Sequence, residues 1–142
     1  MIGIEQAIIE LLVAAQIPER LGIAPEAIRA MADQSGEAPG RAAIIVETVG
    51  WAPYTGTVPG AGVYEGIYQV HLMTHLDEDA DSALMDLGTL HVGQVLEGIA
   101  GDVGGYWVDY NLVSRGQLLI AEPYRTRSWT LTMYIQEATY GE

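Results

Sequence analysis

Three aspartates at alternate positions form the most suggestive chemical motif of the sequence. Asp77, Asp79 and Asp81 have the spacing of the first three ligands of an EF-hand calcium loop. Such a loop also requires Gly at its sixth position and Glu at its twelfth, where this chain has Ser82 and Gly88. Two interpretations remain: the acids favour and cap the start of a following helix, or they form a weak divalent-cation site. The failed spacing favours the first, and we expect no bound metal.

Histidines are the second set of potential metal ligands. His71 and His75 are four residues apart, the spacing at which two side chains on a helix are neighbours. Their segment alternates apolar and polar residues, which is typical of a strand, and residues four apart on a strand lie roughly 13 Å apart. Because that distance is too long for a shared ion, we expect no zinc site. His91 is interpreted as a residue at the boundary of the core.

Residue types that common enzyme mechanisms need are largely missing. The chain has no Cys, and its six basic residues are all Arg, which excludes thiolate nucleophiles, Cys-ligated metals and Schiff-base lysines. The glycines at 60 and 62 lack the third glycine of a dinucleotide-binding fingerprint, and Ser35 does not lie in a nucleophile elbow. Carboxylates are plentiful, but spacing alone places no catalytic pair. We therefore predict a protein that is not an enzyme and that holds no cofactor.

Composition narrows the class of protein further. The 142 residues include 19 Asp and Glu against six basic residues, for a net charge of -13, and 49% of them are hydrophobic. This length and apolar content suit one domain with a real core. The acid excess argues against tight binding to a nucleic-acid backbone, because that affinity comes from cations. With no apolar run of ~20 residues and no basic segment ahead of one, neither a membrane span nor a secretory signal is expected.

A helix is predicted over residues 2–16, because apolar residues recur there with helical spacing. Those on its main apolar face are Ile4, Ile8, Leu11, Leu12 and Ala15. Ile2, Ile9 and Val13 form a second apolar flank beside that face. A surface helix needs only one apolar stripe, so the second flank faces either the chain's own core or another subunit. Both interpretations stay open at this point.

The remaining elements follow from turn residues and hydrophobic period. Residues 17–40 are rich in Pro and Gly and predict a loop-rich insertion with a short helix at Pro25–Met31, and residues 50–62 predict a long loop between strands. Strands are predicted at Ala43–Val49, Val63–Leu76, Tyr106–Val113, Gln117–Glu122 and Ser128–Glu137, with a helix over 83–100. The order α-(α)-β-β-α-β-β-β predicts a single α+β domain over 1–142, in which two main helices pack on a mostly antiparallel sheet.

Arginines in the last third of the chain are the most suggestive charges. Arg125 and Arg127 flank Thr126 between two predicted strands, and Arg115 lies nearby, so half of the positive charge is concentrated there. Their carboxylate partners belong either to the same chain or to a neighbouring copy. The acids at 77, 79 and 81 are one possible set of partners.

Tryptophans divide between core and contact positions. Trp107 and Trp129 lie in predicted strands of a chain without Phe, and we expect both in the core. Trp51 lies in the predicted Pro- and Gly-rich loop, where a core position and a contact with another molecule are equally supported. Arg115, Arg125, Arg127, the three aspartates, Ile9, Val13 and Trp51 are therefore the candidate subunit-interface residues.

The order and size of these elements resemble the tail terminator proteins of long-tailed bacteriophages. The resemblance covers roughly residues 2–137 and depends on the helix Ile4–Ala15, the strand Tyr64–Leu72, the helix Leu84–Ile99 and the stretch Glu122–Tyr134. It implies a hexameric ring that stacks on the last ring of the tail tube, stops tube growth and joins the tail to the head connector or neck protein. It also implies a location in the virion, after assembly in the host cytoplasm.

The charge agrees with the ring that this resemblance implies. An acidic lumen repels phosphate, so DNA would pass through it without being held. A ring also needs a heterologous interface, in which different surfaces of neighbouring copies meet. Two alternatives remain: a small-molecule-binding or hydrolytic α+β domain with a pocket under Trp51–Gly62, and a neck adaptor or tail-tube subunit of the same kind of virion.

Overall fold

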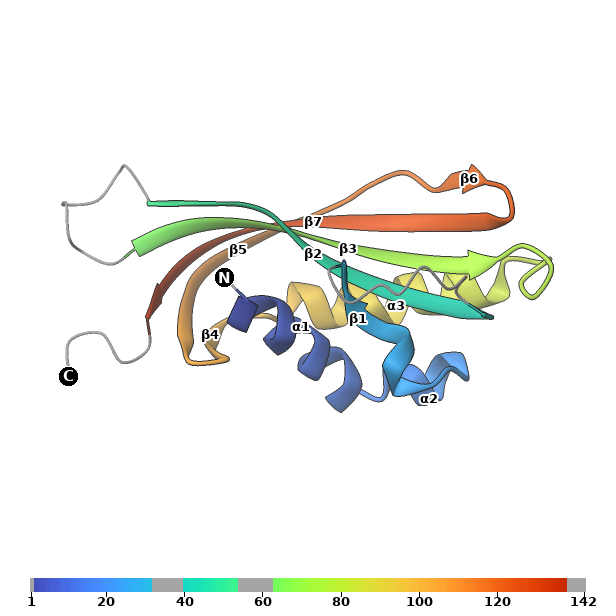
Figure 1. Ribbon diagram of the computed structural model, residues 1–142, viewed down its shortest axis with the longest axis horizontal. Coiled ribbons are helices and arrows are strands. Elements are labelled where there is room, and N and C mark those ends of the chain that lie inside the picture. The colour runs from blue at the N-terminus through green and yellow to red at the C-terminus, as the bar shows by residue number, and fades with distance from the viewer. Residues whose placement is uncertain (1, 32–39, 54–62, 138–142) are drawn as a thin grey trace.

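Helices cover one face of a seven-stranded sheet in the computed structural model, which describes residues 2–31, 40–53 and 63–137 (Figure 1). The helices are α1 (Ile2–Ala14), α2 (Ile17–Leu21) and α3 (Ala83–Glu97), with a 3-10 turn, η1, at Pro25–Ala27. The strands are β1 (Ile28–Ala30), β2 (Ala42–Pro53), β3 (Val63–His75), β4 (Gly101–Val103), β5 (Tyr106–Arg115), β6 (Leu119–Ala121) and β7 (Tyr124–Glu137). The predicted α+β class is confirmed.

The sheet is ordered β1-β2-β3-β7-β5-β4, and β6 pairs with β7 on the side of β7 where β5 also lies. All pairs are antiparallel except β1 with β2. The central strand, β7, pairs with β3 from Val63↔Gln136 to His75↔Tyr124. The mostly antiparallel sheet expected from the sequence is therefore present, with one short parallel addition at its edge.

The side chains of β3 point alternately toward the core and toward the opposite face of the sheet. Tyr68, Val70, Leu72 and Thr74 are buried, whereas the residues between them are partly exposed. This is the period of two read from the sequence, which is confirmed here. Because residues paired in register share a face of the sheet, the alternation also fixes which residues of β2 and β7 point toward the helices.

The first helix buries a different arc from the one predicted. Ile4, Ile8 and Leu12 are fully buried, as expected, but Leu11 is 37% exposed, whereas Ile9 lies in the core. The helix packs against β1 and β2 as well as α2 and α3. A helix with neighbours on several sides buries both apolar flanks in part, so Leu11 of the predicted apolar face is exposed whereas Ile9 of the second flank is buried.

The segment 17–40 is more ordered than predicted. Its described part contains α2, η1 and β1, and the helix expected at Pro25–Met31 is wrong beyond its first turn. Ile28 and Ala30 are buried and alternate with Arg29, which is the pattern of a strand, and they pair with β2 in parallel. Residues 32–39 lie outside the described part.

Residues 50–53 belong to a strand and not to the loop predicted over residues 50–62. β2 continues through Trp51 to Pro53 and pairs with β3 there, and residues 54–62 lie outside the described part. Gly66 of β3 leaves the space for this pairing, because a Cβ at Gly66 would lie 2.7 Å from Cε2 of Tyr68 and 3.0 Å from Cε3 of Trp51. A second short strand, β4, follows α3 at residues for which no strand was predicted.

Tyr68 provides a test of packing in the core. Its ring is fully buried, and its hydroxyl has no hydrogen-bond partner among the described residues. Burial raises the pKa of Tyr68 above its ordinary value, with smaller contributions from the negative charges of Tyr106 and Glu5. We expect Tyr68→Phe to leave the free energy of unfolding at neutral pH unchanged or to raise it, because an unpaired buried hydroxyl is removed. The increase should be at most about 3 kcal/mol.

The same substitution predicts a change in alkaline stability. A folded-state pKa above the unfolded value means that the unfolded chain loses its proton first, so stability falls as the pH rises above about 10. Tyr68→Phe should remove this part of the fall, and urea denaturation between pH 8 and pH 11 measures it. Tyr110→Phe, at an exposed position, is the matched control. A loss of more than about 1 kcal/mol at neutral pH would show that the hydroxyl of Tyr68 has a partner.

Candidate functional site

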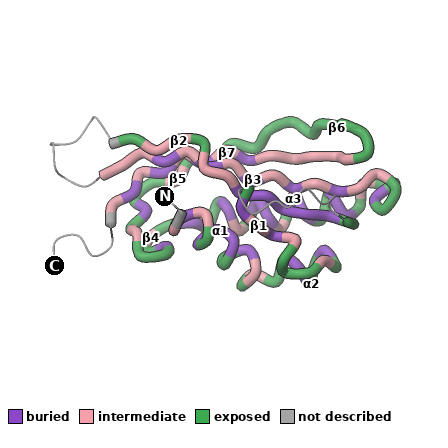
Figure 2. Tube along the Cα trace, viewed as in Figure 1, coloured by how far each residue is buried: buried purple, intermediate pink, exposed green. Residues whose placement is uncertain are grey.

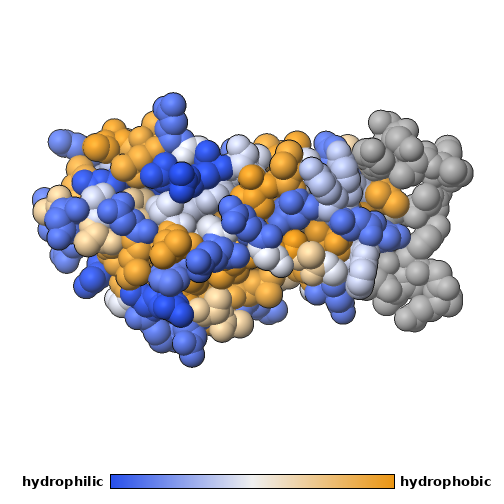
Figure 3. All heavy atoms as spheres, turned by 180° about the vertical axis from the view of Figure 1, so that it is seen from behind, coloured by the Kyte–Doolittle hydropathy of each residue, from blue (hydrophilic) through white to orange (hydrophobic). Residues whose placement is uncertain are grey.

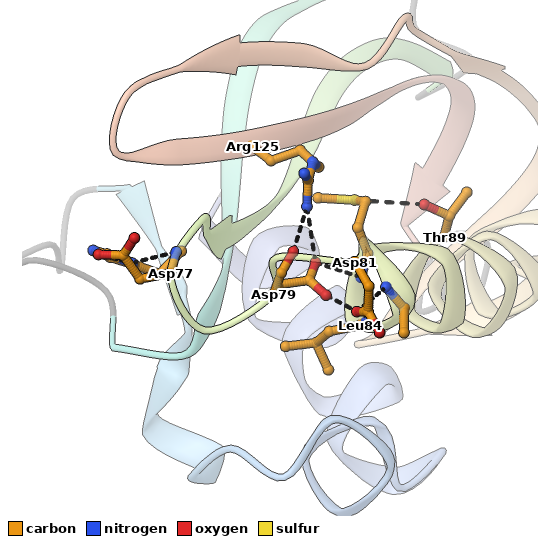
Figure 4. A network of polar contacts seen from close by, with 9 residues as sticks. Asp77, Asp79, Asp81, Leu84, Thr89 and Arg125 are labelled. Atoms are coloured by element: carbon orange, nitrogen blue, oxygen red, sulfur yellow. Dashed lines mark hydrogen bonds and ion pairs between the residues drawn. The ribbon is translucent and has the colours of Figure 1, made fainter.

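Arg125 and Asp79, two of the predicted interface residues, meet within one chain. The Nη1 atom of Arg125, on β7, donates to the backbone oxygen of Asp79 at 2.8 Å and lies 3.3 Å from its Oδ2 (Figure 4). Their side chains are 11% and 1% exposed. Of the two sources of a carboxylate partner left open by the sequence, the same chain supplies it for Arg125. This buried ion pair fastens the loop before α3 to the sheet.

Asp79 also caps α3. Its Oδ1 and Oδ2 accept hydrogen bonds from the backbone N–H groups of Leu84 and Met85 at 2.8 and 3.0 Å. Asp81 accepts one from Ala83 at 3.1 Å. The sequence interpretation of these acids as helix-start residues is confirmed by these bonds.

Asp77 differs from the two capping aspartates. It is exposed, and its Oδ2 lies 4.0 Å from Nδ1 of His75. His71 contacts Glu47 and Ser128 on neighbouring strands at 2.8 and 2.7 Å. Within residues 2–31, 40–53 and 63–137, no three His, Asp or Glu side chains are grouped closely enough to hold a metal ion.

Ile9, Val13 and Trp51 contact the chain's own core. Ile9 is buried in it, and Val13 and Trp51 pack against it with partial exposure. Trp51 stacks on Tyr64, with ring centroids 5.3 Å apart, and its ring meets that of Tyr106 edge-on. Of the two interpretations left open for the second flank of α1, Ile9 and Val13 therefore fit the one in which this flank faces the chain's own core. The aromatic contacts of Trp51 are likewise with side chains of the same chain.

Residues 115–127, here called the arm, lie at the end of the sheet where α3 begins (Figure 1). The arm consists of the end of β5, all of β6 and the start of β7. It holds the other two predicted arginines. Arg127 donates from Nη1 to the backbone oxygen of Gly116 at 3.0 Å, and Arg115 is exposed. Neither arginine has a carboxylate within ion-pair distance in the part of the chain that the structure describes.

The arm is also the most exposed apolar segment of the described chain. Leu119 and Ile120 are 62% and 63% exposed, and Leu118 beside them is 36% exposed. β6 is coloured as exposed along its length in Figure 2, and an apolar patch lies at the same end of the molecule in Figure 3, seen from behind. One edge of β6 pairs with β7, and none of the described residues pairs with the other. An exposed apolar edge of this kind is typical of a surface that binds another chain.

Sequence reasoning did not single out these apolar residues. Residues 118–120 and residues 44–46 are both runs of three apolar side chains, yet the second run is entirely buried. A run of this kind does not reveal whether another strand or helix covers it. The interpretation of Trp107 as a core residue was wrong for a related reason, because this side chain is 47% exposed while Trp129 is buried.

Comparison with known proteins adds a likeness in fold. No protein-family model matches this chain, and no curated protein matches it in sequence. One solved structure, whose designation states no function, has a TM-score of 0.52 over 94% of this chain and 97% of its own length. The two sequences are 17% identical, so the likeness shows a shared fold alone. No helix within the described residues has the length and apolar character needed to cross a membrane.

Proposed function

We propose that this protein is a structural subunit of a bacteriophage tail, which forms a ring on the tail tube, stops tube growth and joins the tail to the head connector. The observation that carries the proposal is the arm, an exposed apolar edge with two arginines that lack carboxylate partners in the described chain. Such a surface is suited to a contact between proteins. The order of helices and strands, which resembles that of tail terminators, supports the same assignment.

Charge favours a second copy as the partner of the arm. The chain carries 19 acidic residues, and Arg115 and Arg127 of the arm have no acidic partner among the described residues. Opposite charges on two copies attract one another and orient the contact. The overall charge of -13 also suits a ring through which DNA passes, because an acidic wall repels phosphate.

The test is the mass of the purified protein across a range of concentrations, measured by size-exclusion chromatography with light scattering. We expect a concentration-dependent shift from monomer to a closed oligomer, and negative-stain images that show single rings. Open-ended tubes would instead indicate a tail-tube subunit. A protein that stays monomeric at the highest concentration, with divalent cations present, would contradict the proposal.

A further inference from the structure

The helix-facing side of the arm combines an apolar side chain with positive charge. Trp129 is buried under α3, so residues at alternate positions of β7, including Arg127 and Arg125, share its face of the sheet. Arg115 is paired with Trp129, and Ile120 is paired with Arg125. Arg115, Ile120 and Arg127 therefore lie on the helix-facing side of the arm, whereas Leu119 lies on the other side.

A groove of complementary character lies between α1 and the turn after β4. It has a volume of about 240 Å³, which is more than the ~150 Å³ cavity that accommodates benzene in another protein. Its charged residues, Glu10 and Asp102, are both acidic and exposed, and Leu11 is the partly exposed apolar residue of α1. The groove is lined by Ala7, Glu10, Leu11, Ala14, Asp102, Val103 and Gly104. Two other grooves on the molecule both include Arg20, so they are less suited to a cationic arm.

The arm and this groove cannot meet within one molecule. β6 and β4 lie at opposite ends of the sheet (Figure 1). A contact between them therefore joins two copies through different surfaces, and leaves the groove of one copy and the arm of the other free. Repetition of such a heterologous contact gives a closed ring when the rotation between copies closes.

We propose that the arm of one copy docks in the α1–β4 groove of the next. Ile120 enters the groove beside Leu11, and Arg115 and Arg127 pair with Glu10 and Asp102. This inference rests on the proposed function, because it assigns the surfaces through which the ring would form. It commits to a second copy of this chain as the occupant of the groove.

Charge exchange tests the docking directly. The arm variant Arg115→Glu/Arg127→Glu and the groove variant Glu10→Arg/Asp102→Arg should each remain monomeric where the wild type is oligomeric, because like charges then face each other. An equimolar mixture of the two variants should recover the oligomer, since each arm meets a groove of opposite charge. A chain that carries all four substitutions should recover it as well. Light scattering gives the masses, and circular dichroism confirms that each variant is folded.

Residues on opposite sides of β6 supply a matched pair. Ile120→Ser should weaken assembly by at least about tenfold, whereas Leu119→Ser, at an equally exposed position on the other side, should leave it unchanged. The chain has no cysteine, so introduced thiols can be cross-linked selectively. Under oxidation, a mixture of the Ile120→Cys and Leu11→Cys variants should form a mixed disulfide dimer, and a mixture of Leu119→Cys with Leu11→Cys should not.

The outcomes separate this inference from the proposed function. A wild-type protein that never associates would overturn both. A wild type that forms rings, together with arm and groove variants that keep the wild-type mass, would overturn the docking alone. Equal cross-linking from positions 119 and 120 would also contradict it, because the two side chains lie on opposite sides of the strand.

Discussion

Replacing Asp79 with alanine is expected to lower the free energy of unfolding by about 3–5 kcal/mol, because it leaves the buried charge of Arg125 without its partner. The substitution also removes the acceptors of two backbone N–H groups at the start of α3. A domain of this kind has a total stability of only about 5–15 kcal/mol. The variant should therefore unfold at a much lower urea concentration and melt well below the wild type.

Neighbouring aspartates provide a graded set of controls for this prediction. Asp81→Ala removes one exposed capping bond and should cost about 0.5–2 kcal/mol. Asp77→Ala, at an exposed position, should change stability by no more than about 0.5 kcal/mol. Arg125→Met should cost less than Asp79→Ala, because Asp79 keeps its bonds to α3. If Asp79→Ala were as stable as Asp77→Ala, the ion pair and the cap would contribute nothing to the fold.

Trp129→Ala is the second substitution with a large expected effect, a loss of about 3–5 kcal/mol. The side chain of Trp129 is 2% exposed and lies against Gly93 of α3. A Cβ atom added at Gly93 would lie 3.6 Å from Nε1 of Trp129. Removing it leaves a cavity between the sheet and the helix that the surrounding backbone cannot fill. Urea denaturation followed by far-ultraviolet circular dichroism measures the loss without depending on tryptophan fluorescence.

Trp107→Ala is the control for the effect at Trp129. Trp107 is about half exposed, so its loss should cost no more than about 1 kcal/mol. Acrylamide should quench the fluorescence of Trp107 strongly and that of Trp129 weakly, when each is compared in a variant that keeps it as the single tryptophan. Equal losses of stability in the two alanine variants would contradict the placement of Trp129 in the core.

Hydrophobic period predicted the long elements well. The alternation of Tyr68, Val70 and Leu72 with polar residues identified β3 and the face that it buries. The helical spacing around Leu84 and Val92 identified α3 in the same way. In both cases one face of the element packs on the core and the other is in contact with water. The spacing of the apolar residues therefore predicts which face is buried.

Short elements and partners were less accessible from the sequence. β1 and β4 have three residues each, too few to show a hydrophobic period. They form because they pair with the longer strands β2 and β5. Arg125 and the acids near Asp79 were recognised as complementary, but only the folded chain brings them within 3.3 Å of each other. Arg115 and Arg127 looked the same in sequence and find no such acid among the described residues, although they lie on the same arm as Arg125.

The position of β7 between β3 and β5 also sets an order in time. The β3–β7 ladder joins residues as far apart in the sequence as Val63 and Gln136, so this edge of β3 stays open until residues 124–137 have left the ribosome. Contacts so distant in sequence form slowly, and an open edge meanwhile invites pairing with other chains. The arm is made immediately before and together with the start of β7, and among the described strands β6 pairs with β7 alone. In a growing chain, the proposed docking surface is thus complete only when the chain can close its own sheet, so under the docking proposal folding precedes assembly.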